Sequence, residues 1–269
     1  MIRFVASPLL SSFNDTITHA FSTREGGING SANADLCVGH NKADAATNDD
    51  ANKQLLAQDL SLAEEQIFSV TQVHGNDILA IAAGDANTND LAGGSYDGII
   101  TNRQKIAVCV KTADCVPILI FAPKQNVIGA IHAGWRSTAL NIAGKAIDVA
   151  ACQFGCNREE ILVAIGPAIG ACCYEVDDLV LEALAQGYKE LSSGGEIEDY
   201  LQACFTPSPQ IGRWFLDLKA ANRWQLSRAG VLACNVDTIE RCTSCEADSF
   251  FSHRRDREKG RMLNLIMLR

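Results

Sequence analysis

The stretch TADCVPILIFAPKQNVIGAIHAGWRST, residues Thr112–Thr138, decides the fold class of this chain. It holds two near-continuous apolar runs, Val116–Phe121 and Val127–His132, with a polar segment between them. Apolar runs without polar alternation are typical of strands that are covered on both faces. We therefore expect both runs to be buried strands of a sheet.

A helical pattern follows these two runs. Apolar residues recur at the spacing of one helix face from Thr138 to Ala151, which predicts a helix over this range. Ser137 stands just before it and is a suitable N-cap, because its hydroxyl accepts a hydrogen bond from the first turn. Buried strands combined with such helices indicate an α/β fold.

Similar strand and helix patterns occur in the sequence before and after this stretch. Further strands are predicted at Ile17–Ser22, Ile67–Val73, Ile78–Ile81, Gly98–Thr101, Ile106–Lys111, Ile161–Ile165, Arg213–Leu216 and Val231–Asn235. Further helices are predicted at Asp49–Leu60, Asp178–Tyr188 and Leu218–Ala229, and loops at Gly84–Tyr96 and Ser192–Glu196. No long linker interrupts the pattern. We expect residues 1–269 to form a single α/β domain, with a central mixed sheet flanked by helices.

The amino-acid composition argues against some classes of binding partner. The chain has 23 Lys and Arg against 32 Asp and Glu, and its net charge is −9. Because nucleic-acid binding needs clustered basic side chains, we expect no nucleic-acid partner. The one dense cationic run, at residues 254–257, is equally explained as a solvated or internally paired turn.

We expect no membrane span, because no apolar run approaches about 18 residues. Residues 1–13 lack signal-peptide features, so we expect a cytoplasmic protein.

Eleven cysteines are an odd number, and a chain of this length does not require disulfides. Cys109, Cys204 and Cys234 lie in apolar runs and are predicted to be reduced core residues. Cys242 and Cys245 have C-x-x-C spacing, but no second pair lies nearby in the sequence. The neighbours Cys172 and Cys173 are adjacent, which is awkward for one metal ion. A structural zinc site or a redox motif at Cys242 and Cys245 is therefore the less favoured interpretation.

Three other residues form a candidate metal centre, namely His74, Cys115 and His132. Each stands at the end of a strand-like segment, with small residues close by. Two imidazoles and one thiolate suit zinc, and three protein ligands leave the fourth position open, as catalysis requires. The same set also suits copper. The three positions are far apart and show no local metal-finger spacing, and a lone histidine is more often structural.

Sequence blocks around these residues carry a strong resemblance. They are FSTREGG at Phe21–Gly27, QVHG at Gln72–Gly75, YDGIIT at Tyr96–Thr101, TADCVPI at Thr112–Ile118, IHAGWRS at Ile131–Ser137, IGPAIGACCYEV at Ile165–Val176, RCT at Arg241–Thr243 and FFSHRRDREKGRM at Phe250–Met262. With these blocks the chain resembles the laccase-domain, or polyphenol oxidase-like, family. That family is now described as purine nucleoside phosphorylases, and it includes proteins resembling peptidoglycan editing factors.

The resemblance implies a fold, a metal and an activity. It places zinc on His74, Cys115 and His132 in a single α/β domain, with a three-layer architecture similar to that of cysteine hydrolases. The implied substrates are purine nucleosides and phosphate: adenosine, inosine and methylthioadenosine would be cleaved to a free base and a ribose 1-phosphate. Deamination of adenosine is also implied. We expect a monomer or a homodimer.

Further site residues follow from this chemistry. The chain lacks the H-x-E and P-C-x-x-C motifs of zinc deaminases, so another acid must move the proton, and Asp114 is the adjacent candidate. Asp114 is equally explained as a carboxylate that fixes a ligand or a turn.

Arg24 and Arg136 are candidates for binding phosphate, because guanidinium groups bind phosphate in a bidentate manner. Each arginine is equally explained by a salt bridge. Arg136 is expected just before a helix. Glu175 and His253 are expected at the same pocket.

Two other enzyme classes stay open. A copper-dependent polyphenol oxidase is implied by the older family name, but five histidines without an H-x-H pair do not suffice for a multicopper cluster. A hydrolase with Cys115 as nucleophile and a histidine as base would edit peptidoglycan precursors. A non-enzymatic metal-binding scaffold is the remaining alternative.

Overall fold

The computed structural model describes residues 2–29, 35–38, 46–85, 94–191, 197–257 and 260–269. Its centre is the antiparallel pair β8 (Val116–Ala122) and β9 (Val127–Ala133), which correspond to the two apolar runs predicted as buried strands. They belong to a six-stranded sheet in the order β14-β10-β8-β9-β6-β5. The other members are β5 (Ile78–Ile81), β6 (Gly98–Thr101), β10 (Leu162–Ile165) and β14 (Val236–Thr238). Its two outermost pairs are parallel and the others antiparallel, so the sheet is mixed.

A second, five-stranded sheet faces the first one. Its order is β1-β2-β15-β7-β4. Its strands are β1 (Phe4–Val5), β2 (Ile17–Ser22), β4 (Ile67–Ser69), β7 (Ala107–Thr112) and β15 (Met262–Leu268). Phe21, Val108 and Ile266 of this sheet pack against Leu119 and Ile128 of the six-stranded sheet. The interface between the two sheets is therefore one of the hydrophobic cores.

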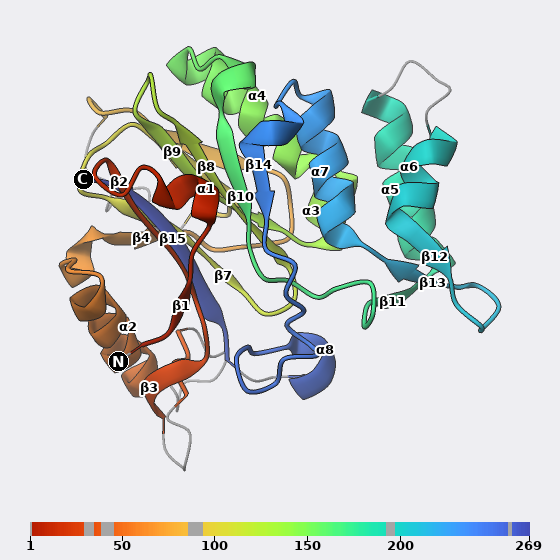
Figure 1. Ribbon diagram of the computed structural model, residues 1–269, viewed down its shortest axis with the longest axis horizontal. Coiled ribbons are helices and arrows are strands. Elements are labelled where there is room, and N and C mark those ends of the chain that lie inside the picture. The colour runs from red at the N-terminus through yellow and green to blue at the C-terminus, as the bar shows by residue number, and fades with distance from the viewer. Residues whose placement is uncertain (1, 30–34, 39–45, 86–93, 192–196, 258–259) are drawn as a thin grey trace.

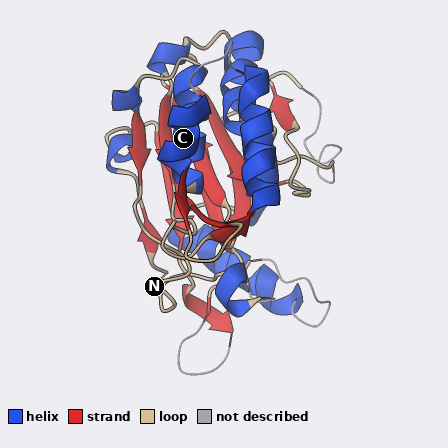
Figure 2. Cartoon of the chain, turned by 90° about the vertical axis from the view of Figure 1, so that its right-hand side faces the viewer, coloured by secondary structure: helices blue, strands red, loops and turns tan. Residues whose placement is uncertain are grey.

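Helices cover the outer faces of both sheets (Figure 1). Helices α3 (Trp135–Ala139), α4 (Ile142–Phe154) and α7 (Leu218–Arg228) lie over the six-stranded sheet, where their apolar residues join its core. Helix α2 (Ala46–Asp59) lies over the five-stranded sheet, where Leu56 packs with Leu263 and Leu265. Figure 2 shows the strands enclosed between helices. Both sheets are thus covered on both faces, which explains their near-continuous apolar strands.

Smaller elements complete the described chain. Helices α5 (Asp178–Leu191) and α6 (Ile197–Cys204) stand beside a three-stranded sheet of β11 (Glu175–Asp177), β13 (Arg213–Leu216) and β12 (Phe205–Pro207). The remaining elements are α1 (Pro8–Ser11), β3 (Glu25–Asn29), α8 (His253–Asp256) and the short 3-10 turns Glu64–Gln66, Arg158–Glu160 and Ala233–Asn235. No helix in the described ranges combines the length and the apolar character that crossing a membrane requires.

The fold class is confirmed, because the domain is α/β and its mixed sheets are flanked by helices. The strands are divided between two facing sheets and a small third one, where one central sheet in three layers was expected. A fully buried strand has the same apolar sequence whether it is covered by helices or by a second sheet, so the sequence does not distinguish the two arrangements.

Most predicted elements are present, and several have the predicted bounds. Strands β2, β5, β6 and β13 coincide with their predicted ranges, whereas β4 ends four residues earlier, at Ser69. The predicted strand Val231–Asn235 is wrong, because the chain forms a 3-10 turn at Ala233–Asn235 and the strand begins at Val236. Cys234 is accordingly exposed, while Cys109 and Cys204 are buried as predicted. The predicted loop Ser192–Glu196 and most of Gly84–Tyr96 lie outside the described residues.

The predicted helix Thr138–Ala151 consists of two helices. Asn141 has a left-handed backbone, with φ of 58°, and separates α3 from α4. Gly134 is the N-cap of α3, so Ser137 lies inside a helix and its assignment as an N-cap is wrong. The apolar spacing continues across the break, and spacing alone therefore cannot reveal it.

Candidate metal centre

His74, Cys115 and His132 come together at the ends of the central strands. Cys115 directly precedes β8, and His132 is the penultimate residue of β9, paired with Pro117. Because Val116 pairs with Ala133, the antiparallel register places Cys115 beside the end of β9. His74 arrives from a different segment, five residues beyond the end of β4, in a turn where its φ is 61°.

The three side chains form a compact group of donor atoms. Their ligand atoms all lie within 4.8 Å of one another, and Cys115 Sγ is 3.9 Å from His74 Nε2. The two imidazole rings stand edge to face, with centroids 4.8 Å apart. His132 is buried, Cys115 is partly buried and His74 is exposed, so one side of the group faces solvent. The three donor groups lie close enough together for a shared metal site.

A buried carboxylate, Asp97, fixes two of the three candidate ligands. His132 Nδ1 donates to Asp97 Oδ1 at 2.8 Å, and this bond leaves Nε2 of the ring free to bind a metal ion. The backbone N–H groups of Val73, His74 and Gly75 donate to the same carboxylate at 3.2, 3.0 and 2.6 Å. Burial alone would raise the pKa of Asp97, but these hydrogen bonds hold it below its usual value.

Asp97 is absent from the residues singled out in the sequence. It lies in the YDGIIT block, directly before β6, and its full burial distinguishes it from an ordinary turn aspartate. Only the strand alignment brings it to His132, whose backbone N–H also donates to the Asp97 carbonyl at 2.7 Å. The feature of the sequence that could have pointed to Asp97 is a carboxylate at the start of an apolar strand.

Gly134 leaves room for the side chains of His74 and Cys115. A Cβ atom at this position would lie 3.0 Å from His74 Cδ2 and 3.1 Å from Cys115 Sγ. A side chain here would therefore require His74 and Cys115 to shift by a few tenths of an ångström.

The electrostatics of the group favour a thiolate beside an imidazolium in the absence of a metal. Burial disfavours ionisation of Cys115, but the charges and hydrogen bonds of His132 and His74 outweigh it and lower the pKa of the thiol to about 6. Burial also favours neutral His132, but the negative charges of Cys115 and Asp97 raise its pKa to about 9. A thiolate is the form of cysteine that binds metals and acts as a nucleophile.

The donor set and its surroundings fit a zinc ion. Two histidine nitrogens and one thiolate are three of the four ligands that tetrahedral zinc takes, and a carboxylate behind one histidine is the usual supporting group. The solvent-facing side at His74 is where a fourth ligand has access.

Asp114, the residue before Cys115, points toward the C-terminal segment. Its Oδ1 accepts a hydrogen bond from Thr243 Oγ1 at 2.6 Å, and its Oδ2 accepts from Ser252 Oγ at 3.1 Å and the Arg254 N–H at 2.7 Å. Its backbone is left-handed, with φ of 91°. These bonds hold the turn from which Cys115 emerges.

The two candidate phosphate-binding arginines differ in their surroundings. Arg24 makes a bidentate pair with Asp35 through Nε and Nη2, at 2.9 and 2.7 Å, and donates to the Ala247 carbonyl. Arg136 is exposed, and its guanidinium lies over the Trp135 ring at 4.2 Å. It is the second residue of α3, so its predicted place before the helix is wrong.

Glu175 and His253 lie in neighbouring segments. Glu175 begins β11, and Ser208 Oγ donates to its carboxylate at 2.6 Å. The Glu175 carbonyl accepts from Arg254 Nη1 at 2.8 Å, and this bond ties it to the segment that carries His253. His253 is exposed at the first position of α8.

Comparison with known proteins gives a consistent result. Residues 18–269 match the family described as multi-copper polyphenol oxidoreductase laccase. The chain is 39% identical over 250 residues to purine nucleoside phosphorylase YlmD of Geobacillus stearothermophilus, covering 91% of this chain and 88% of that protein. It is 34% identical over 245 residues to adenosine deaminase RL5 from an unknown prokaryotic organism, covering 88% of each.

The fold is shared with a solved relative. The crystal structure of YlmD from Geobacillus stearothermophilus superposes with a TM-score of 0.84 at 36% identity, covering 98% of this chain and 94% of that one. Matches in sequence and in structure thus extend over nearly the whole chain. The chain therefore belongs to the laccase-domain family, as its sequence blocks predicted.

Proposed function

We propose that the chain is a zinc-dependent purine nucleoside phosphorylase acting on adenosine, inosine and methylthioadenosine, and that it also deaminates adenosine. Relatives named for these two activities, at 39% and 34% identity, support the proposal. The observation that carries it is the convergence of His74, Cys115 and His132, with Asp97 behind them.

The chain's own residues have distinct roles in this proposal. His74, Cys115 and His132 hold the zinc ion, while Asp97 orients His132 and the backbone that carries His74. A bound zinc ion supplies Lewis-acid chemistry for either reaction. The nucleoside enters from the side of exposed His74, because His132 is buried.

We assign phosphate binding to Arg136 rather than to Arg24. Arg136 lies two residues beyond Gly134, where an added Cβ atom would meet His74 and Cys115, and Arg136 is exposed. Arg24 already uses two of its nitrogens on Asp35. Tyr174 borders the same region: burial raises its pKa, the nearby charges of Cys115 and Asp114 raise it further, and Arg254 and Arg136 oppose the rise.

Product analysis tests the assignment directly. The protein is incubated with adenosine, with and without phosphate, and the products are separated by chromatography. Adenine that forms only with phosphate supports phosphorolysis, and inosine that forms without phosphate supports deamination. Formation of neither product contradicts the proposal.

A second candidate function rests on one observation. A possible catalytic series exists in which Cys115 is the nucleophile, His132 the base and Asp97 the carboxylate that orients the base. The pKa of Cys115 is also lowered. This arrangement suits a cysteine hydrolase that would act on peptidoglycan precursors. Covalent labelling of Cys115 by substrate in active, metal-free protein favours the hydrolase, whereas loss of activity with the metal favours the phosphorylase.

Copper is the second candidate metal, because the same donor set suits it. A single copper ion here would support at most a weak polyphenol oxidation. Elemental analysis of the purified protein distinguishes copper from zinc, and a polyphenol oxidation assay tests the activity.

A further inference from the structure

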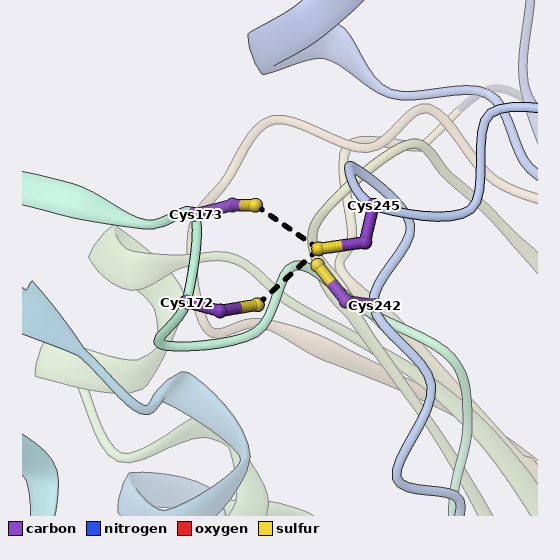
Figure 3. A group of neighbouring side chains, drawn as sticks. All are labelled: Cys172, Cys173, Cys242 and Cys245. Carbon is purple, nitrogen blue, oxygen red and sulfur yellow. Dashed lines mark hydrogen bonds between the residues drawn. The ribbon is translucent and has the colours of Figure 1, made fainter.

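Four cysteine side chains meet at a second position in the fold. Cys172 and Cys173 lie in the turn after β10, and Cys242 and Cys245 lie in the turn after β14. Figure 3 shows the two pairs pointing toward each other from opposite loops. No second pair lies near Cys242 and Cys245 in the sequence, but the fold brings Cys172 and Cys173 next to them.

Backbone hydrogen bonds hold the two turns side by side. Ala168 and Cys242 form a parallel bridge, in which the Thr243 N–H donates to the Ala168 carbonyl at 3.1 Å. Cys173 and Tyr174 both donate their N–H groups to the Gly170 carbonyl at 3.0 Å, which closes the first turn tightly. This turn presents both adjacent cysteines to the opposite loop.

The spacing of the sulfur atoms matches a metal site. Cys245 Sγ is 3.5 Å from Cys172 Sγ and 3.3 Å from Cys173 Sγ, and all four sulfurs lie within 4.8 Å of one another. Zinc–sulfur bonds of about 2.3 Å in a tetrahedron place the sulfurs about 3.8 Å apart. Sulfurs joined in a disulfide are only about 2.05 Å apart. The four cysteines are all free, and the Cys245 sulfur distances are much closer to the zinc-site spacing than to a disulfide.

The surroundings suit a group of thiolates. The Gly170 N–H donates to Cys242 Sγ at 3.2 Å, a contact that stabilises negative charge on the sulfur. A Cβ atom on Gly170 would lie 3.3 Å from Cys172 Sγ, so glycine preserves this approach. Arg255 donates to the carbonyls of Thr243 and Ser244, at 2.9 Å each, and these bonds fix the C-x-x-C turn.

We propose that Cys172, Cys173, Cys242 and Cys245 bind one structural zinc ion, separate from the centre at His74, Cys115 and His132. Four thiolates occupy every position of a tetrahedral ion, so this second site is closed and performs no chemistry. Soft sulfur ligands select zinc over magnesium and calcium.

The proposed ion joins two loops that both contact Asp114. Thr243, inside the C-x-x-C turn, donates to the Asp114 carboxylate, and the Ile169 N–H donates to the Asp114 carbonyl at 3.0 Å. Asp114 precedes the ligand Cys115. A metal ion between the loops therefore stabilises the turn that presents Cys115.

Metal analysis of designed variants tests the proposal. Zinc-loaded wild-type protein is expected to hold two zinc ions per chain. The double variant Cys242→Ser/Cys245→Ser is expected to hold one zinc ion, and the control variant Cys152→Ser/Cys234→Ser is expected to hold two. The control replaces exposed cysteines outside the cluster. One zinc ion in the wild-type chain, with the same content in Cys242→Ser/Cys245→Ser, overturns the proposal.

A second measurement keeps the test decisive if the cysteine variant does not fold. His74→Ala/His132→Ala removes ligands of the other centre and is expected to keep one metal ion. Loaded with Co²⁺, it is expected to show the intense visible absorption and sulfur-to-metal charge transfer of a tetrathiolate site. Absence of these bands, or a disulfide between these cysteines in freshly purified metal-free protein, overturns the proposal.

Discussion

Asp97 Oδ1 lies 2.8 Å from Nδ1 of His132, and both side chains are buried. The same carboxylate accepts the N–H groups of three consecutive residues that include His74. One side chain therefore sets the orientation of the His132 ring on β9 and the conformation of a turn that follows β4.

Asp97→Asn tests this arrangement. The amide keeps the size of the side chain but loses the negative charge that orients His132, so we expect zinc affinity at the His74 centre to fall about 10- to 100-fold. A competitive chelator titration measures it. Asp148→Asn is the control, because Asp148 is exposed and pairs with Arg158. Equal affinity in wild type and Asp97→Asn would contradict this role.

Gly134→Ala tests the close approach of the backbone to the ligands. The new Cβ would lie 3.0 Å from His74 and 3.1 Å from Cys115, so these side chains must shift by a few tenths of an ångström. We expect the zinc content of this centre to fall while the circular dichroism spectrum is unchanged. Gly84→Ala is the matched control, because no atom lies within 4 Å of its added Cβ. Full zinc occupancy in Gly134→Ala would show that the site tolerates a side chain there.

Asp114→Asn separates a positioning role from a proton-transfer role. Its carboxylate accepts three hydrogen bonds, and loss of the charge weakens all of them. We expect the free energy of unfolding to fall by about 1–3 kcal/mol in urea denaturation. Asp85→Asn, at an exposed turn, is the control. Unchanged stability together with lost turnover would instead assign proton transfer to Asp114.

The two arginines are expected to respond differently to replacement by alanine. Arg136→Ala should raise the apparent KM for phosphate several-fold and leave the thermal midpoint unchanged, because its guanidinium is exposed. Arg24→Ala should lower the thermal midpoint, because Asp35 loses a bidentate partner. Steady-state kinetics and thermal denaturation measure both effects. An unchanged KM for phosphate in Arg136→Ala would remove it from the phosphate site.

The sequence predicted the central strands well, and it singled out three residues, His74, Cys115 and His132, that the fold brings together. Fully buried strands such as β8 and β9 carry an unbroken apolar pattern, and their ends are where Cys115 and His132 stand. β15 was missed although it lies in the middle of the five-stranded sheet. Its apolar run contains Asn264, which is buried and donates to the Val110 carbonyl and to Thr112.

Residues whose roles depend on distant segments were not predictable in the same way. Asp97 acts through backbone groups of residues 73–75, which the loop pairing of Thr71 with Ser95 brings alongside. Cys172 and Cys245 are adjacent only because Ala168 pairs with Cys242. Local spacing contains no information about such pairings, so neither the carboxylate nor the four-cysteine cluster emerged from the sequence.

The most direct test measures phosphorolysis by metal-depleted protein before and after zinc is restored. Wild type and Cys115→Ser are stripped with a chelator, reconstituted with zinc, and supplied with adenosine and phosphate. We predict that only zinc-restored wild type forms ribose 1-phosphate and adenine. Equal rates of formation in zinc-restored wild type and Cys115→Ser, or full activity of the stripped wild type, would contradict the assignment of catalysis to the His74, Cys115 and His132 centre.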